Sequence, residues 1–291
     1  MEHSWSMEYA RILVKGIDGL LSRANTSAEK GGSWMDVKSL EERIVLLEEG
    51  LARLQDENRK LLKVRDVQEI QNVMSMHEYF HAACRHREEM DAIWALKTPG
   101  LAFEEALLNG RYVGLDAIRG YYVDFFDRFF KAALHEVRGI FPSLKDDPED
   151  RLAFGVQILH TLTTPVIEVA DDRETAKAVW LSPGHVTAPV GGSLQAFWHW
   201  DRYAVDFVKE SGAWKIWHLW VGKDFTTPYE KSWVETALDP GPGIRLDAHP
   251  DFPKPNAPGL MPYTGYSPFK VARFEPRPPV PYRTFSETFS Y

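Results

Sequence analysis

The stretch that decides the fold is residues 200–218, which read WDRYAVDFVKESGAWKIWH. Apolar and aromatic side chains occupy every second position on either side of a Glu-Ser-Gly turn. Because successive side chains of a strand point to opposite faces, this alternation is typical of two half-buried strands joined in a hairpin. We expect the two apolar faces to meet, with Phe207 opposite Trp214 and Tyr203 opposite His218.

The period of two also governs the sequence before the hairpin. Asp, Gly, Pro and Ser residues break it into segments of strand length. Strands are predicted at Val156–Val169, Thr175–Ser182, Gln195–Lys209 and Ala213–Lys223, with turns at 171–172, 183–184, 191–192 and 210–212.

Helices are predicted ahead of these strands. Asp66 followed by Glu69 has the spacing of a capping box and predicts that a helix starts there. Further helices are predicted at Leu115–Leu134 and Asp147–Phe154. Helices followed by an antiparallel meander indicate an α+β protein. A strongly curved, cone-shaped sheet packed on the helices would enclose a hollow with aromatic walls.

Residues 35–65 carry the clearest helical periodicity. Leucine and isoleucine recur at alternating spacings of four and three from Leu40 to Leu61, which is the pattern of a coiled-coil seam. Asn58 occupies an a position of this heptad pattern, and a single Asn there favours a parallel dimer in one register. The sequence therefore predicts a homodimer, and the alternative is that the stripe packs on its own domain.

The two ends of the chain differ in composition from the middle. Residues 1–34 combine a short amphipathic run with a Gly/Ser-rich linker, and translation could start at Met1 or at Met35. Residues 239–291 contain 12 of the 19 prolines together with regularly spaced aromatics, which predicts an extended arm laid on a surface. The expected domains are 1–34, 35–65, 66–238 and 239–291.

Charge and cysteine content exclude several classes of protein. A net charge of −8 and a pI near 5.7 argue against nucleic-acid binding, which needs clustered Lys and Arg. Cys84 is the single cysteine, so intrachain disulfides and Cys-rich zinc modules are excluded. The sequence lacks an apolar run of membrane-spanning length and a signal-peptide pattern. We expect a cytoplasmic protein without a membrane partner.

Motifs for nucleotide, serine-hydrolase and zincin chemistry are also missing from the sequence. This favours cofactor-free chemistry by histidine and tyrosine side chains, which move protons near neutral pH. His160 begins an apolar strand run, and His218 lies on the hairpin's aromatic face. His77 and His81 are four apart on a helix, but no second ligand pair accompanies them, so no metal site is predicted. His185 is expected at a strand end or in a loop, where it points either into the mouth of the hollow or into water.

Several of these segments together resemble the SnoaL-like branch of the nuclear transport factor 2-like superfamily. The resemblance covers roughly residues 66–238. It rests on DVQEI at 66–70 leading into a helix with Tyr79, the His-led strand HTLTTPVI at 160–167, and the hairpin at 200–218.

The resemblance implies a cone-shaped, commonly dimeric α+β fold that hosts lyases, isomerases, cyclases, hydrolases and binding proteins. In dehydratase-like members a helix Tyr and a strand His carry much of the acid/base work, and Tyr79 and His160 match them by position. Those members also use an Asp about one turn after the Tyr. This chain has Cys84 and Arg85 there, so His81 is the substitute candidate.

The sequence therefore predicts a cofactor-free lyase acting on a hydroxylated aromatic or polycyclic small molecule. His160 would be the base, and Tyr79 or His218 the acid. An isomerase, a cyclase, a hydrolase or a non-catalytic binding protein remains an alternative in the same hollow. The expected substrate-binding residues are Tyr203, Trp180, His185, Trp200, Trp214, Trp220 and Arg85; the tryptophans could equally be core residues, and Arg85 part of a solvated basic patch.

Overall fold

The structure is a computed structural model that describes residues 37–108, 110–144, 154–237, 250–260, 265–288 and 290. The chain divides into two compact units, residues 1–62 and residues 63–291. The N-terminal extension 1–34 lies outside the described residues, as does nearly all of the helix expected at Asp147–Phe154, of which Phe154 lies in a turn.

Helix α2 (Val37–Ala82) supplies all the described residues of the first unit and continues into the second. In the described part of the first unit most of its leucines are exposed: Leu47 is 66% exposed and Leu54 is 65% exposed. An apolar seam of this kind is stable in water when a partner helix covers it. Dimerisation through this seam stays a prediction.

The helix does not restart at Asp66, contrary to the capping-box prediction. Asp66 lies inside α2 and is buried, and it accepts hydrogen bonds from three side chains of the same unit. Arg173 Nε donates over 2.6 Å, Lys209 Nζ over 3.0 Å and Trp214 Nε1 over 3.1 Å. Burial alone would raise the pKa of Asp66, but these donors lower it overall. The carboxylate therefore ties the helix to the sheet instead of capping a helix end.

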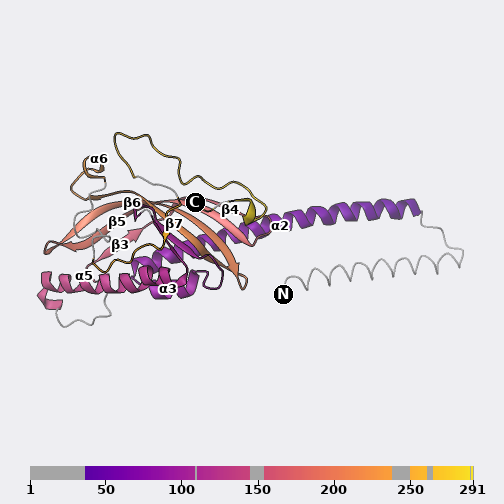
Figure 1. The fold of residues 1–291 in the computed structure, drawn as a ribbon. Coiled ribbons are helices and arrows are strands. Elements are labelled where there is room, and N and C mark those ends of the chain that lie inside the picture. Colours follow the sequence, from indigo (N-terminus) through magenta and orange to yellow (C-terminus); the bar gives the residue numbers. More distant parts are fainter. Residues whose placement is uncertain are drawn as a thin grey trace. The chain divides into compact units, whose positions relative to one another are not determined.

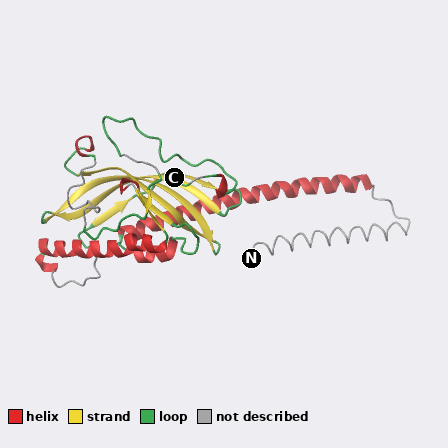
Figure 2. Cartoon of the chain, viewed as in Figure 1, coloured by secondary structure: helices red, strands yellow, loops and turns green. Residues whose placement is uncertain are grey.

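The second unit is built on a curved, open sheet, and its longer helices line one side of that sheet (Figures 1 and 2). The order across the sheet is β3-β5-β6-β7-β1-β2-β8, with β4 also paired to β5. Only the β1–β7 pair is parallel among these described strands. The strands are β1 (Ala102–Glu105), β2 (Gly110–Val113), β3 (Gln157–His160), β4 (Thr163–Val169), β5 (Thr175–Val190), β6 (Ser193–Glu210), β7 (Ala213–Pro228) and β8 (Ala257–Pro258). The α+β prediction is confirmed.

The hairpin β6–β7 forms, but its predicted register is wrong. A two-residue Ser-Gly turn joins the strands, and Phe207 pairs with Ile216 and Tyr203 with Val221. Such a tight turn matches the twist of the strands better than the expected three-residue turn. A bulge then leaves Trp217 without a partner residue in β6. The bulge turns His218 away from the face that carries Ile216.

The turn predicted at Pro183-Gly184 is also wrong, because β5 runs straight through both residues. Gly184 instead lets two strands approach closely. A Cβ atom built on Gly184 would lie 2.3 Å from the backbone oxygen of Leu159 in β3. A side chain at this position would push β3 away from β5.

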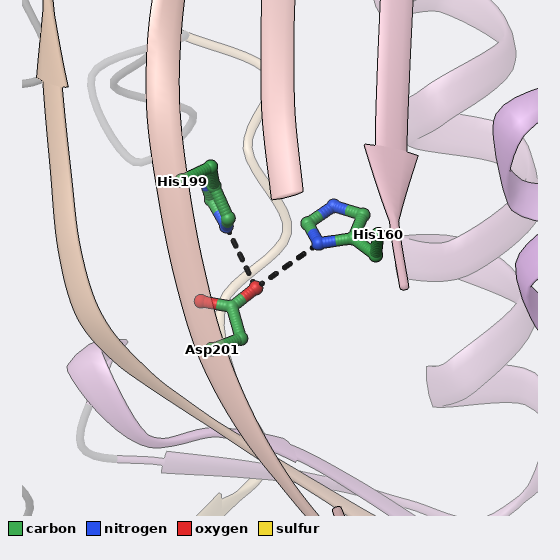
Figure 3. Close-up of side chains that lie close together, drawn as sticks. All are labelled: His160, His199 and Asp201. Carbon is green, nitrogen blue, oxygen red and sulfur yellow. Dashed lines mark hydrogen bonds and ion pairs between the residues drawn. The ribbon is translucent and has the colours of Figure 1, made fainter. Parts of the chain in front are cut away.

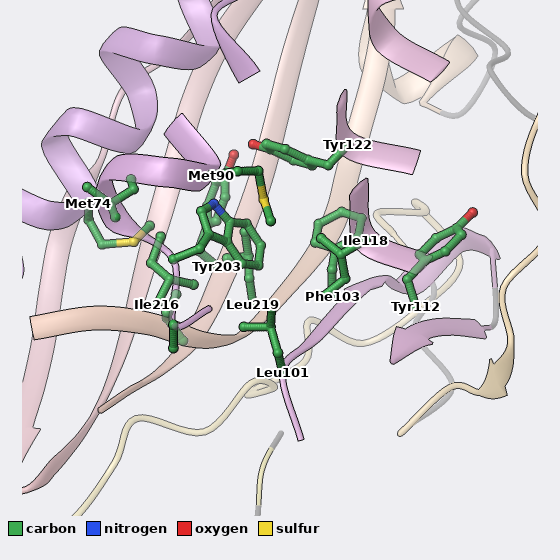
Figure 4. Close-up of a cluster of buried hydrophobic side chains, with 14 of the residues drawn as sticks. Met74, Met90, Leu101, Phe103, Tyr112, Ile118, Tyr122, Tyr203, Ile216 and Leu219 are labelled. Atoms are coloured by element: carbon green, nitrogen blue, oxygen red, sulfur yellow. The ribbon is translucent and has the colours of Figure 1, made fainter. Parts of the chain in front are cut away.

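A helical layer covers the inner face of the sheet. It comprises the C-terminal part of α2, α3 (His86–Ile93), α4 (Leu115–Arg119), a π-helical turn η2 (Gly120–Phe125) and α5 (Phe126–Ile140). The helix predicted at Leu115–Leu134 corresponds to the last three. The wider turn of η2 buries Tyr121 and Tyr122 side by side. Figure 4 shows part of the resulting core, where Tyr122 and Tyr203 come from opposite layers.

The described part of the C-terminal segment runs along the sheet in extended form. Strand β8 adds to β2, and the side chain of Arg202 donates to the backbone oxygens of Arg273 and Glu275. Ser290 Oγ donates to Asp206 Oδ2 over 2.8 Å. Because Arg202 and Asp206 point away from the helical layer, this segment lies on the outer face of the sheet. The short helix α6 (Trp233–Thr236) precedes it. Among the described residues, no helix is long and apolar enough to cross a membrane.

Candidate active site

A cavity of about 130 Å³ lies between the helical layer and the inner face of the sheet. Its wall is mainly aromatic and aliphatic, and its polar groups are mostly histidines and carboxylates. The lining residues whose side chains bear on the chemistry are His77, His81, Phe103, Glu105, Tyr121, Tyr122, Phe126, Phe129, His160, His199, Asp201, Tyr203 and Lys223.

Three buried polar side chains meet on the sheet side of this cavity (Figure 3). His199 and Asp201 are two apart on β6, so both point inward. His160, the last residue of β3, pairs with Gly184, and Gly184 pairs in turn with His199. Two strands that are not neighbours in the sheet thus bring His160 to the level of His199 and Asp201.

The distances join these three side chains through one carboxylate oxygen. His199 Nε2 lies 2.7 Å from Asp201 Oδ2, and His160 Nδ1 lies 3.5 Å from the same oxygen. The other ring nitrogen of His199, Nδ1, lies 3.0 Å from Thr226 Oγ1. His199 is therefore held at both nitrogens, whereas His160 Nδ1 has no hydrogen-bond partner among the described residues.

Burial decides the charges in this cluster. It lowers the pKa of His160 to about 3, helped by the neighbouring His199, so the imidazole is neutral near pH 7. Burial would raise the pKa of Asp201, but the adjacent His199 outweighs it and the pKa is lowered overall. The arrangement is a neutral imidazole facing an ionised carboxylate inside a largely apolar cavity.

A second set of polar groups lies on the helix side of the cavity. His77 Nδ1 is 2.7 Å from Glu89 Oε1, which also accepts a hydrogen bond from Trp94 Nε1 over 3.0 Å. Burial would lower the pKa of His77, but Glu89 raises it overall. His81 Nδ1 lies 3.1 Å from His86 Nε2. Burial lowers the pKa of both, to about 4 for His86. His77 is therefore the helix histidine that carries a proton most readily.

Glu78 and Tyr203 add two groups that keep their protons. Both carboxylate oxygens of Glu78 are buried, and burial raises its pKa to about 8. Burial, followed by the charge of Glu78, raises the pKa of Tyr203 well above its ordinary value. The Tyr203 hydroxyl is thus a hydrogen-bond donor at the cavity wall near neutral pH.

The structure brings three of the predicted residues to the cavity: His160, His81 and Tyr203. The rings of His81 and His160 lie 5.4 Å apart, centroid to centroid. Tyr79 is not part of this group, because it lies on the opposite side of α2 and is 76% exposed. The expected pairing of Tyr79 with His160 is therefore wrong. Helix periodicity explains the difference, since His77 and His81 are four apart and define the inner face.

His218, His185 and Arg85 do not line the cavity either. The bulge in β7 turns His218 to the outer face, where its Nδ1 lies 2.8 Å from Asp206 Oδ2 and its Nε2 lies 3.1 Å from the Gly100 oxygen. His185 is half-buried and lies 3.0 Å from Gln157 Oε1. Arg85 is exposed and pairs with Glu88.

The four predicted tryptophans do not form the cavity wall. Trp180 and Trp214 are core residues on the inner face. Trp200 and Trp220 point to the outer face, Trp220 against Ala106 and Val179. Apart from Tyr203 on β6, the Phe and Tyr rings that line the cavity come from the helical layer and β1, including Tyr121, Phe126 and Phe103. The high Trp content of the strands thus serves mainly to pack both faces of the sheet.

Sequence reasoning missed His199, Asp201 and Lys223 as residues of the site. The first two carried a usable signal, because a His and an Asp alternate with two Trp in the run HWD that follows Trp198. Lys223 Nζ lies 3.7 Å from Glu105 Oε1 at the cavity. Lys223 and Glu105 come together only through the pairing of β7 with β1. Because these strands are far apart in the sequence, no local pattern links the two residues.

An open sheet over helices with a polar cluster in a mainly apolar cavity defines an α+β fold of the small-molecule-binding kind. The family model described as SnoaL-like domain matches residues 63–219, which is more than half of the chain. The chain therefore belongs to the SnoaL-like domain family, as the sequence resemblance predicted.

Comparison with solved structures gives distant similarities. LinA is 14% identical, with a TM-score of 0.40, over 60% of this chain and 96% of that chain. A hexachlorocyclohexane dehydrochlorinase, LinA-type3 from Novosphingobium barchaimii, is 13% identical, with a TM-score of 0.37, over 58% and 94%. An NTF2-like protein with a cystatin-like fold from Novosphingobium aromaticivorans is 16% identical, with a TM-score of 0.32, over 69% and 94%. No curated protein matches this sequence.

Proposed function

We propose that this protein is a lyase that eliminates a small leaving group from a hydroxylated aromatic molecule by acid/base chemistry. The observation that carries the proposal is the pairing of His160 with Asp201 at the wall of an otherwise mostly apolar cavity. A neutral imidazole can accept a proton, and an adjacent carboxylate stabilises the imidazolium that forms.

The dehydration would proceed as a β-elimination. His160 takes a proton from the carbon next to the one that carries the leaving hydroxyl, and the C–H electron pair becomes the new double bond. The C–O bond breaks, and Tyr203 donates its proton to the departing oxygen, which leaves as water. Asp201 remains ionised and holds the charge of the protonated His160. In the formaldehyde-releasing variant, the base takes the hydroxyl proton, the O–H electron pair forms the C=O bond of formaldehyde, and the C–C bond breaks. The carbon left behind keeps the electron pair of that bond and takes a proton back from the protonated His160.

The size of the cavity supports a substrate with one ring over a polycyclic one. A buried apolar cavity of about 150 Å³ accommodates benzene in another protein. The cavity here, about 130 Å³, is of that size. The rings of Phe103 and Tyr122 at its wall suit a flat ligand. A monocyclic phenol with a short hydroxylated side chain is therefore the substrate class to test first.

The experiment compares the wild-type chain with His160→Ala and with the matched control His185→Ala. Phenolic alcohols are screened by ultraviolet absorbance, and products are weighed by mass spectrometry for the loss of water or formaldehyde. We expect His160→Ala to lower kcat by about 10²–10⁴-fold, as loss of a general base does, and His185→Ala to have no effect.

Circular dichroism and the melting temperature show whether the variants fold. Activity that survives in a folded His160→Ala variant would refute the assignment of the base. A product of unchanged mass would indicate an isomerase or cyclase in the same cavity, and a gain of water would indicate a hydrolase. Saturable ligand binding without turnover would indicate a binding protein.

A further inference from the structure

We propose that His160, His199 and Asp201 form a binding site for one divalent transition-metal ion such as Zn²⁺. The ligand atoms would be His160 Nδ1, His199 Nε2 and an oxygen of Asp201. One possible ligand atom from each of the three side chains lies within 4.8 Å of the other two. Two imidazoles and one carboxylate are a ligand set that borderline ions such as Zn²⁺ favour.

The distances leave room for an ion after small side-chain rotations. Zinc bonds of about 2.0–2.2 Å in a tetrahedron place neighbouring ligand atoms about 3.3 Å apart. His160 Nδ1 and Asp201 Oδ2 are 3.5 Å apart, close to that value. His199 Nε2 and Asp201 Oδ2 are 2.7 Å apart and would separate by about half an ångström on binding.

Two buried atoms of the cluster lack a hydrogen-bond partner among the described residues: His160 Nδ1 and Asp201 Oδ1. Both belong to side chains that are at least nine-tenths buried, where an unpaired polar atom costs free energy. A cation at this point would be coordinated by the lone pair of His160 Nδ1. The negative charge of the Asp201 carboxylate would attract it.

The surroundings of His199 match those of a metal ligand. Histidines that bind metals usually donate a hydrogen bond from the N–H of their second ring nitrogen to a neighbouring oxygen. This hydrogen bond fixes the tautomer and the ring orientation. Thr226 Oγ1, 3.0 Å from His199 Nδ1, is placed to accept this hydrogen bond. The remaining nitrogen, Nε2, is then the one that faces Asp201.

The cavity supplies the open side of the site, because all three ligands line it. With three protein ligands, a tetrahedral ion keeps one position for water or for a small molecule in the cavity. A neutral imidazole has a single acceptor nitrogen, so His160 with an ion on Nδ1 cannot also accept a proton, and the metal-bound and base-competent forms of His160 exclude each other. The inference does not depend on the reaction, because metal binding is measured without substrate.

The test titrates the metal-free, full-length chain with Zn²⁺ by calorimetry and with Co²⁺ by visible absorption. We expect one ion per chain, and a Co²⁺ spectrum with the intense bands of low coordination number. His199→Gln and Asp201→Asn should each weaken binding by more than 10-fold, because even the loss of a group that only orients a ligand costs 10–100-fold. Thr226→Val should weaken it by about 10-fold.

The matched control is His185→Ala, which removes a histidine outside the cavity and should bind Zn²⁺ like the wild type. Circular dichroism and melting curves check that each variant folds, and Thr226→Val serves if the ligand variants do not fold. The proposal is overturned if the wild type binds no stoichiometric Zn²⁺. It is overturned equally if folded His199→Gln and Asp201→Asn variants bind with wild-type affinity.

Discussion

Replacing Glu78 with glutamine should make the protein more stable near neutral pH. Glu78 has both carboxylate oxygens buried, and burial raises its pKa from 4.5 to about 8 in the folded state. In the unfolded chain the carboxyl is exposed and ionises at its ordinary pKa. Folding at pH 7 must therefore keep a proton on a group that would release it in water.

The direction and size follow from this difference in pKa. The contribution of protonated Glu78 to stability is fully present below about pH 4.5 and is lost progressively as the pH rises to about 8. At pH 7 the loss amounts to at most about 3.4 kcal/mol, from about 2.5 pH units above the ordinary pKa at 1.36 kcal/mol per unit. Relaxation around the ionised group reduces it, so we expect Glu78→Gln to gain about 1–3 kcal/mol at pH 7.

The assay is urea unfolding of the wild type and of Glu78→Gln at several values between pH 4.5 and 8. The free energies of unfolding should converge near pH 4.5 and diverge as the pH rises. Glu69→Gln is the matched control, because Glu69 lies on the exposed side of the same helix and its variant should follow the wild-type pH dependence. A pH-independent difference, or a Glu78→Gln variant that is less stable at pH 7.5, would refute the reasoning.

Three further predictions follow from buried or uncovered groups elsewhere. Asp66→Ala leaves Arg173, Lys209 and Trp214 without their shared acceptor. It should lower the free energy of unfolding in urea by about 3–5 kcal/mol. A decrease below about 1 kcal/mol would contradict the role of Asp66 in holding α2 to the sheet. Gly184→Ala places a Cβ 2.3 Å from a β3 backbone oxygen. It should lower the melting temperature, and it should lower the affinity for Zn²⁺ because β3 carries the ligand His160. An unchanged melting temperature and an unchanged affinity would contradict the role of this close approach. The double variant Leu47→Glu/Leu54→Glu should shift the full chain from dimer to monomer in analytical ultracentrifugation and leave the fold of residues 63–291 intact. A wild-type chain that sediments as a monomer would exclude the coiled-coil dimer.

The sequence identified some site residues because their signal is local. His160 begins an apolar strand run, His81 follows His77 by one helical turn, and Tyr203 lies on an alternating strand. Each of these patterns places a side chain on the inner face of its own element. The choice among the histidines needed the tertiary structure, because inner faces meet only once the sheet has formed.

Two backbone features explain the main errors. The bulge at Trp217 reverses the facing of the side chains from His218 to Lys223, up to a second register shift at Asp224. His218 therefore leaves the cavity side although its spacing from Trp214 and Ile216 is regular. The uninterrupted path of β5 through Pro183 and Gly184 could not be read from a dipeptide that usually marks a turn.

The expected order of all helices before all strands is wrong, because β1 and β2 lie between α3 and α4. By itself the sequence determined the α+β class, the hairpin at 200–218 and the family. These follow from periodicity and turn residues, which act between neighbours in the chain. Only the tertiary structure decided that Asp201 lies between His160 and His199. That meeting depends on the β3–β5–β6 register, which many weak contacts across the sheet set together and which a shift of one residue would abolish.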